Sequence, residues 1–232
     1  MNRFALLLIC IFALLISACI PASASPTATA VPATASPTFT AVPTFTEVPL
    51  PTPTPPFLDL DNGKKAVVYD FTERLCEANW MNGGEKHLPC PGDLNDPLHG
   101  YVGLLSGSDL GLPDDLAMVV MYPAQPSSGY GAIFGRFPKF KAGPFDVFRA
   151  SLACRSGANC DVEFSLGYYD WNGEFKETYP KVAYKQGDPP VNIKQPLGGI
   201  VGKPVEFVLI IRANGDPANA WALLVAPRVL RP

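Results

Sequence analysis

The stretch Val205-Glu206-Phe207-Val208-Leu209-Ile210-Ile211 decides the fold of this chain. It is rich in β-branched and aromatic residues, which favour strands. Successive side chains of a strand point to opposite faces, so one face carries Phe207, Leu209 and Ile211. The other face is apolar too, because it carries Val208 and Ile210. We therefore predict a central strand that is covered on both sides.

The segments around this strand have the same character. They are short, rich in Val, Ile, Phe and Tyr, and separated by Gly, Pro, Asn and Asp at the spacing typical of a sandwich, whereas helical runs are absent. The pattern predicts an all-β domain over residues 57-232, an antiparallel β-sandwich of the jelly-roll type. The expected strands are Lys65-Phe71, Tyr101-Leu105, Leu116-Tyr122, Tyr130-Phe137, Asp146-Cys154, Asp161-Asp170, Glu174-Tyr179, Val182-Gln186, Val191-Gln195, Val205-Ala213 and Ala220-Val225.

The segment Asp161-Tyr179 is predicted to be a β-hairpin. Alternation buries one row of its side chains, namely Val162, Phe164, Leu166 and Tyr168. The pair Asn172-Gly173 favours a two-residue type I′ turn. Gly167, Tyr169 and Trp171 then point outward.

Across that turn the hairpin is expected to place a carboxylate and an ammonium beside two aromatic faces. These groups can stack on a sugar ring and bind its hydroxyls, which makes Tyr169, Trp171, Glu174 and Lys176 candidate ligand-binding residues. The alternative interpretation is cross-strand packing of aromatic side chains near a hairpin tip. Trp80 and Trp221 are expected to anchor the core.

The C-terminal sequence resembles a known fold family. Phe207 to Asp216, Ala220-Trp221-Ala222 and Pro227-Arg228-Val229-Leu230 are similar to the closing strands of galactose-binding-like jelly rolls, especially the carbohydrate-binding modules of the NPCBM type. The resemblance covers about the last thirty residues and implies carbohydrate binding. Those modules commonly have an acidic residue before the tryptophan, where this chain has Ala220, so no metal or ligand role is carried over to that position.

The N-terminal residues have the pattern of an export signal. Met1-Asn2-Arg3 precedes an uncharged run from Phe4 to Ile16, which as a helix would cover about 20 Å of the ~30 Å hydrocarbon core, a length typical of a signal peptide. Leu15-Ile16-Ser17-Ala18-Cys19 resembles the lipobox of bacterial lipoproteins. The resemblance implies a signal peptide over 1-18, cleavage before Cys19, and acylation of Cys19 as the membrane anchor.

Two other interpretations of this segment remain open. One is an ordinary secretory signal cut at Ala18 or after Ser23-Ala24, and the other is an uncleaved anchor that reaches Ile20. All three interpretations place the domain on the extracytoplasmic side. We expect a lipid-anchored protein at the cell membrane.

Residues 19-56 are predicted to be a disordered linker. Positions 20-56 contain 10 Pro, 9 Thr, 7 Ala and 3 Ser, and their only charge is Glu47. Such a segment has no apolar periodicity from which to build a core, and its repeated small-Pro-Thr pattern favours extended polyproline II.

Four cysteines fall in the predicted domain. An even number in an exported domain predicts disulfides, and of the three possible pairings we choose the local ones, Cys76-Cys90 and Cys154-Cys160. The alternative is a zinc site built from Cys76, His87, Cys90 and a distant cysteine, although the close Cys or His spacing of such sites is missing. The acidic clusters at Asp59-Gly63 and at Asp109, Asp114 and Asp115 are interpreted as acidic turns, so no metal is expected.

The net charge and the motifs that are missing exclude some classes of function. The formal charge of -3 leaves no basic surplus for phosphates, so nucleic-acid binding is disfavoured. Catalytic and cofactor-binding signatures are missing from the sequence, and we expect a non-enzyme without a cofactor. The hypothesis is a lipid-anchored, non-catalytic binding module for a glycan. The alternatives are a structural or protein-interaction domain that contacts an envelope protein, and a hydrolase such as a glycosidase acting through two carboxylates.

Overall fold

A computed structural model describes residues 65–95, 97–110, 116–123, 131–178 and 181–232. The predicted signal peptide 1-18, Cys19 and the linker 19-56 lie outside the described residues, as do Asp59-Gly63, Asp114 and Asp115. The described residues belong to one compact unit, Pro51–Pro232. No helix in these described ranges is long and apolar enough to cross a membrane.

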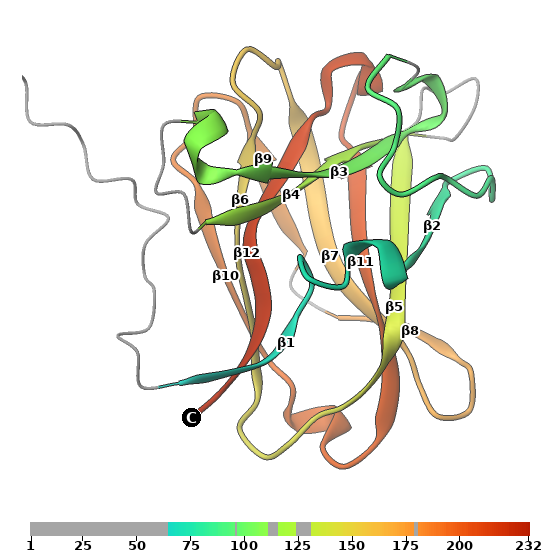
Figure 1. Cartoon of the computed structure of the whole chain (residues 1–232), viewed down its shortest axis with the longest axis vertical. Coiled ribbons are helices and arrows are strands. Elements are labelled where there is room, and N and C mark those ends of the chain that lie inside the picture. The colour runs from blue at the N-terminus through green and yellow to red at the C-terminus, as the bar shows by residue number, and fades with distance from the viewer. Residues whose placement is uncertain (1–64, 96, 111–115, 124–130, 179–180) are drawn as a thin grey trace, which may run out of the picture. The chain divides into compact units, whose positions relative to one another are not determined.

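Two antiparallel six-stranded sheets form the domain (Figure 1). The first sheet has the order β10-β6-β12-β4-β3, with β1 paired to β12, and the second has the order β2-β5-β11-β7-β8, with β9 paired to β7. The strands are β1 (Ala66–Asp70), β2 (Asn79–Asn82), β3 (Tyr101–Ser106), β4 (Ala117–Tyr122), β5 (Ala132–Lys141), β6 (Val147–Cys154), β7 (Asp161–Tyr169), β8 (Phe175–Glu177), β9 (Val182–Lys185), β10 (Val191–Pro196), β11 (Pro204–Ala213) and β12 (Ala222–Arg231).

The connections pass repeatedly from one sheet to the other, as in a jelly roll. The described helical segments are all short 3-10 turns, η1 (Leu75–Glu77), η2 (Pro97–His99), η3 (Gly107–Leu110), η4 (Gly198–Ile200) and η5 (Pro217–Asn219). The predicted all-β sandwich is therefore confirmed.

β11 is the central strand of the second sheet, between β5 and β7, as predicted (Figure 1). Its inward residues Phe207, Leu209 and Ile211 are fully buried. On the outer face of the same sheet, Val208 is 3% exposed and Ile210 is 0% exposed. Side chains from neighbouring strands must therefore cover the outer face at β11, because none of the described strands forms a third layer over it.

Aromatic side chains dominate the core between the sheets. Trp80, on β2, is 1% exposed, and its Nε1 donates a hydrogen bond to the Leu75 carbonyl at 2.8 Å. This confirms Trp80 as a core anchor. Trp221 is half-buried against the core, where it stacks on Tyr122 with 4.4 Å between ring centroids.

Three strands differ clearly from the prediction. β5 was expected to end at Phe137, but it continues to Lys141. β2 was missed because Asn79-Trp80-Met81-Asn82 is short and half of it is asparagine, which is rare in strands. β12 was expected to end at Val225, but it continues to Arg231 past Pro227. A register shift between Val225 and Arg228, with a positive φ of 46° at Ala226, accommodates the proline in a bulge.

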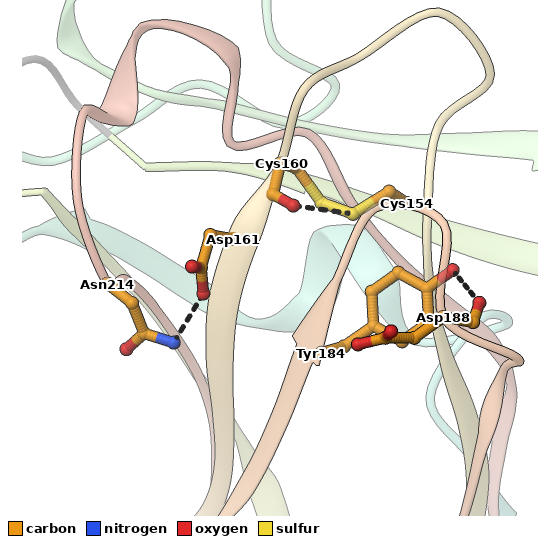
Figure 2. The surroundings of a disulfide bond; sticks show 6 residues. All are labelled: Cys154, Cys160, Asp161, Tyr184, Asp188 and Asn214. Atoms are coloured by element: carbon orange, nitrogen blue, oxygen red, sulfur yellow. Dashed lines mark hydrogen bonds between the residues drawn. A yellow bond between two sulfur atoms is a disulfide. The ribbon is translucent and has the colours of Figure 1, made fainter.

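Both predicted disulfides are present, Cys76–Cys90 with 5.2 Å and Cys154–Cys160 with 6.1 Å between Cα atoms. Because Cys76 and Cys90 bond to each other, they do not form the alternative zinc site. Figure 2 shows that Cys154, at the end of β6, joins Cys160, just before β7. This disulfide therefore links the two sheets.

Hydrogen bonds hold the chain around the second disulfide. The Asn214 side-chain amide donates to Asp161 Oδ1 at 2.9 Å, and the Tyr184 hydroxyl donates to the Asp188 carbonyl at 2.9 Å (Figure 2). The first bond ties the end of β11 to the start of β7, and the second closes the turn after β9.

Candidate functional site

An apolar surface runs across the outer face of the second sheet. Phe175, on the edge strand β8, reaches over Gly167 on β7, because a Cβ at Gly167 would lie 2.6 Å from Phe175 Cε2 and 3.3 Å from Ile210 Cδ1. Only glycine leaves room for the ring at this position. Phe175 thereby helps to cover β11, yet it remains 42% exposed.

The turn between β7 and β8 differs from the predicted type I′ turn. The Asp170 N–H donates to the Glu174 carbonyl, and the Gly173 N–H donates to the Asp170 carbonyl, which leaves a three-residue loop over 171–173. Gly173 has φ of +81°, as loops of this length require, and Asp170 Oδ1 accepts hydrogen bonds from the Asn172 and Glu174 N–H groups. The predicted two-residue turn was wrong because the Asp170 side chain stabilises the longer loop.

The first part of a groove lies beside Phe175 and has a volume of about 290 Å³. β2, β5, β7, β8 and β11 and the turn after β2 contribute to it. Its lining residues are Met81, Asn82, Gly83, Glu85, Phe134, Arg136, Tyr169, Phe175 and Val208. We call it the Phe175 half.

The second part of the groove lies beside the loop between β7 and β8 and has a volume of about 300 Å³. It is more polar than the first part. Its lining residues are Arg136, Lys139, Tyr169, Asp170, Trp171, Asn172, Gly173, Pro204 and Glu206. We call it the hairpin half, and the two halves together the outer groove.

Arg136 and Tyr169 line both halves of the outer groove. The Arg136 guanidinium carbon lies 4.0 Å from the centroid of the Tyr169 ring, a cation–π contact. Arg136 Nε also donates a hydrogen bond to Glu206 Oε2 at 2.8 Å, and its Nη2 donates to the same oxygen. The guanidinium is therefore held by β11 and β7 together, and it orients the ring that separates the halves.

The structure brings two of the four predicted ligand-binding residues to this groove. Tyr169 lines both halves, and Trp171 lines the hairpin half. Trp171 is 50% exposed, and Lys203 Nζ lies 4.8 Å from the centroid of its ring. Glu174 and Lys176 line neither half.

Glu174 and Lys176 form an exposed ion pair of their own. Strand alternation turns them away from the side of β8 that carries Phe175. Lys176 Nζ lies 2.6 Å from Glu174 Oε2, and this hydrogen bond raises the pKa of Lys176.

An ion-pair network occupies the rest of the outer face. The Arg212 guanidinium lies 2.7 Å from Glu177 Oε1, and Lys181 Nζ lies 3.1 Å from Glu163 Oε1. Burial pushes the pKa of Glu177 upward, but hydrogen bonds from Ser165 and Arg212 and the nearby cations outweigh burial, so this pKa lies below its usual value. The charges in this network neutralise one another.

The sequence prediction missed most lining residues of the outer groove, including Phe134, Arg136, Phe175 and Glu206. One signal was available in β11, where Glu206 shares a face with the apolar residues Val208 and Ile210. That face implied an outer apolar surface bordered by a carboxylate. The other residues that line the groove lie on other strands, and the sequence of β11 does not show which strands pair with it.

The groove residues do not suggest a metal centre. Among the described residues, no group of three or more His, Cys, Asp or Glu side chains could hold a metal ion. The carboxylates of the hairpin half, Asp170 and Glu206, already accept hydrogen bonds from the protein.

Several solved structures are similar to this chain, at low sequence identity. No protein-family model matches the sequence, and no curated protein matches it. Among solved structures, CBM22-1-GH10 modules of Xyn10B from Clostridium thermocellum, complexed with xylohexaose, match over 71% of this chain and 28% of that chain, with 12% identity and a TM-score of 0.40. A xylan-binding domain from CBM 22 matches over 72% of this chain and 95% of that domain's chain, with 11% identity and a TM-score of 0.40. TmCBM61 in complex with β-1,4-galactotriose matches over 56% of this chain and 81% of the TmCBM61 chain, with 7% identity and a TM-score of 0.37.

Proposed function

We propose that this domain is a non-catalytic module that binds carbohydrate in the outer groove, and that the protein is exported and lipid-anchored through Cys19. The observation that carries the binding proposal is the exposed aromatic lining of a groove on the outer face of the sheet. Three features of the groove support it.

The first feature is a set of aromatic faces suited to sugar rings. Trp171 and Phe175 are 50% and 42% exposed, and Tyr169 lies between them in the groove. The apolar C–H face of a pyranose ring stacks on such side chains, which bury large apolar area with few rotatable bonds. Apolar side chains that gather in one exposed patch are typical of an interaction site, whereas single exposed rings are not.

The second feature is the polar boundary between the halves. Arg136 and Glu206 present a guanidinium and a carboxylate in fixed positions, and sugar hydroxyls can accept hydrogen bonds from the guanidinium and donate them to the carboxylate. Each half is close to the lower bound of about 300 Å³ for a small-molecule pocket, which is suitable for a small sugar unit. Two such halves joined at Arg136 and Tyr169 suit consecutive units of a glycan chain.

The third feature is the state of the two carboxylates that line the hairpin half. Glu206 is bound by Arg136, and Asp170 Oδ1 is bound by two backbone N–H groups of the loop. A glycosidase needs one carboxyl group that can give up a proton and a second that is free to attack or to activate water. Carboxylates that serve as hydrogen-bond acceptors for the protein support binding instead of hydrolysis.

Export and lipid anchoring rest on different observations. The order Leu15-Ile16-Ser17-Ala18-Cys19 after an uncharged run supports acylation of Cys19. The two disulfides support export, because structural disulfides persist in oxidising compartments outside the cytoplasm. The Pro/Thr-rich linker 19-56 would then hold the module away from the membrane surface.

A glycan array probed with the full-length protein tests the binding proposal. We expect binding to at least one class of oligosaccharide, and Trp171→Ala should weaken it about tenfold, or ~1.4 kcal/mol, while stability changes by less than about 0.5 kcal/mol. Phe145→Ala is the matched control, because Phe145 is 79% exposed and lines neither half.

Two results would contradict the proposal. One is the absence of binding to any glycan, together with specific capture of an envelope protein through the same groove. The other is a loss of several kcal/mol of stability in Trp171→Ala, which would show that the ring is structural.

A further inference from the structure

We infer that the hairpin half of the outer groove selects sugars that carry an anionic group, which Lys139 and Lys203 bind. This inference rests on the proposed carbohydrate function and adds the chemical class of the ligand. It follows from how charges are distributed over the outer face of the second sheet.

Three cations of this face have carboxylate partners. Arg136 pairs with Glu206, while Arg212 and Lys181 pair with Glu177 and Glu163. These groups neutralise one another within the protein. They contribute hydrogen bonds to the surface but little net charge.

Lys139 and Lys203 are different. Within the part of the chain that the structure describes, neither has a carboxylate within ion-pair distance, and both adjoin the hairpin half. Lys139 lines it from β5, and Lys203 lies over the Trp171 ring at 4.8 Å. A sugar that stacks on Trp171 would therefore lie next to an ammonium group.

The nearby carboxylates neutralise these two lysines only in part. Glu206 is the cross-strand neighbour of Lys139, but its Oε2 accepts both hydrogen bonds from Arg136. Asp170 lines the hairpin half with one negative charge, so one of the two positive lysine charges remains without a counterpart. Lys141, opposite Pro204 in the register, adds a third exposed ammonium at the same end of the sheet.

The Phe175 half has the opposite character. It lacks a lysine among its lining residues, and Glu85 contributes an exposed carboxylate. An anionic substituent is repelled there and attracted at the hairpin half. The two ends therefore orient a charged glycan chain, with its anionic unit beside Trp171.

The test compares matched pairs of oligosaccharides on the full-length protein by calorimetry. The pairs are galacturonate trimers and their methyl esters, glucuronate oligomers and their methyl esters, and sulfated and unsulfated galactose oligomers. We expect the acidic member of at least one pair to bind about tenfold more tightly, with an advantage that shrinks as salt rises. The pairs also distinguish carboxylate from sulfate recognition.

The variant Lys139→Gln/Lys203→Gln removes both ammonium groups. At exposed sites each should contribute about threefold, so the double variant should lose about tenfold in affinity for the acidic ligand and little for its neutral partner. Lys185→Gln/Lys194→Gln is the control with the same change in net charge, because both lysines are exposed and lie outside the groove on β9 and β10. It should leave the preference unchanged.

The outcomes separate this inference from the proposed function. Equal binding of acidic and neutral members in every pair, or an equal loss in the control variant, overturns the charge selectivity while carbohydrate binding stands. Failure to bind any sugar, acidic or neutral, overturns both.

Discussion

Arg136 on β5 lies over the ring of Tyr169 on β7, with 4.0 Å between the guanidinium carbon and the ring centroid. The two residues are on strands that flank β11, so the contact passes across the central strand. Glu206 of β11 accepts the guanidinium hydrogen bonds. One side chain thus connects three strands at the boundary between the halves of the groove.

We expect Arg136→Ala to weaken carbohydrate binding about tenfold, because the Tyr169 ring loses its support and the groove loses a donor. Stability should fall by no more than about 1 kcal/mol, since the pair is partly exposed. Titration with the glycan that the array identifies measures the first effect, and urea unfolding measures the second. Arg155→Ala removes a comparable contact, with Trp221, and should leave binding unchanged.

Gly135→Ala should destabilise the domain by about 1–3 kcal/mol, as overpacking of a core does. A Cβ at Gly135 would lie 2.4 Å from Trp80 Cη2, and the indole is held by its hydrogen bond to the Leu75 carbonyl. Urea unfolding measures the loss. Gly215→Ala is the matched control, because a Cβ there has no atom within 4 Å, and a similar loss in both variants would contradict the packing argument.

Asp146→Asn should cost about 2 kcal/mol at neutral pH. Arg231 donates two hydrogen bonds of 2.8 Å to the buried Asp146 carboxylate, which holds its pKa below the ordinary 3.8. Because the pKa of Asp146 is lower in the folded state, its ionised carboxylate stabilises the protein at pH values above the unfolded-state pKa. This stabilisation is lost as the pH falls through the folded-state pKa.

The stability difference between Asp146→Asn and the unmodified protein should therefore be full above about pH 5 and disappear in stronger acid. Denaturant unfolding from pH 2 to pH 7 measures it. Asp188→Asn changes an exposed carboxylate and should have a small effect throughout. If the stability difference for Asp146→Asn did not depend on pH, the ionised Asp146 carboxylate would not be its cause.

Removing the disulfides should cost about 3 kcal/mol for Cys76–Cys90 and about 2.4 kcal/mol for Cys154–Cys160, following the sizes of the loops that they close. Paired Cys→Ala variants and denaturant unfolding give these values. A thiol assay on the denatured, unreduced protein should find none of these four thiols free. Detection of all four would show that the disulfides do not form.

Cys19→Ser should release the protein from the membrane or leave its signal unprocessed, because the hydroxyl cannot replace the thiol in acylation. Two or more acyl chains give stable attachment, whereas one is marginal. Membrane fractionation and the mass of the mature N-terminus provide the measurement. Normal cleavage with unchanged membrane retention would rule out the lipoprotein proposal.

Several features could be predicted from the sequence because they depend on neighbours along the chain. Strand periodicity of two makes Phe207 and Val208 face opposite sides wherever the strand lies, so the doubly covered β11 was evident in advance. The same rule placed Tyr169 on the outer face, opposite Tyr168. Local disulfide pairing is similar, since a short loop brings Cys154 and Cys160 together at little entropic cost.

The length of the loop between β7 and β8 could not be predicted from the turn residues Asn172-Gly173 alone. Asn172-Gly173 favours a two-residue turn, but the Asp170 carboxylate accepts two N–H groups and selects a three-residue loop. That choice sets Phe175 opposite Tyr169 and turns Glu174 away from the face that carries Tyr169. One extra residue in a loop changes which side chains share a face, because register and facing are coupled.

The residue pattern along the chain was enough to predict the sandwich, its central strand, the cysteine pairs and the outward direction of Tyr169. It did not predict that Arg136 and Glu206 meet the Tyr169 ring, or that Lys139 and Lys203 adjoin Trp171. These contacts join separate strands through sheet pairing. Strand order and register depend on the packing of the whole core, which no single segment of the chain specifies.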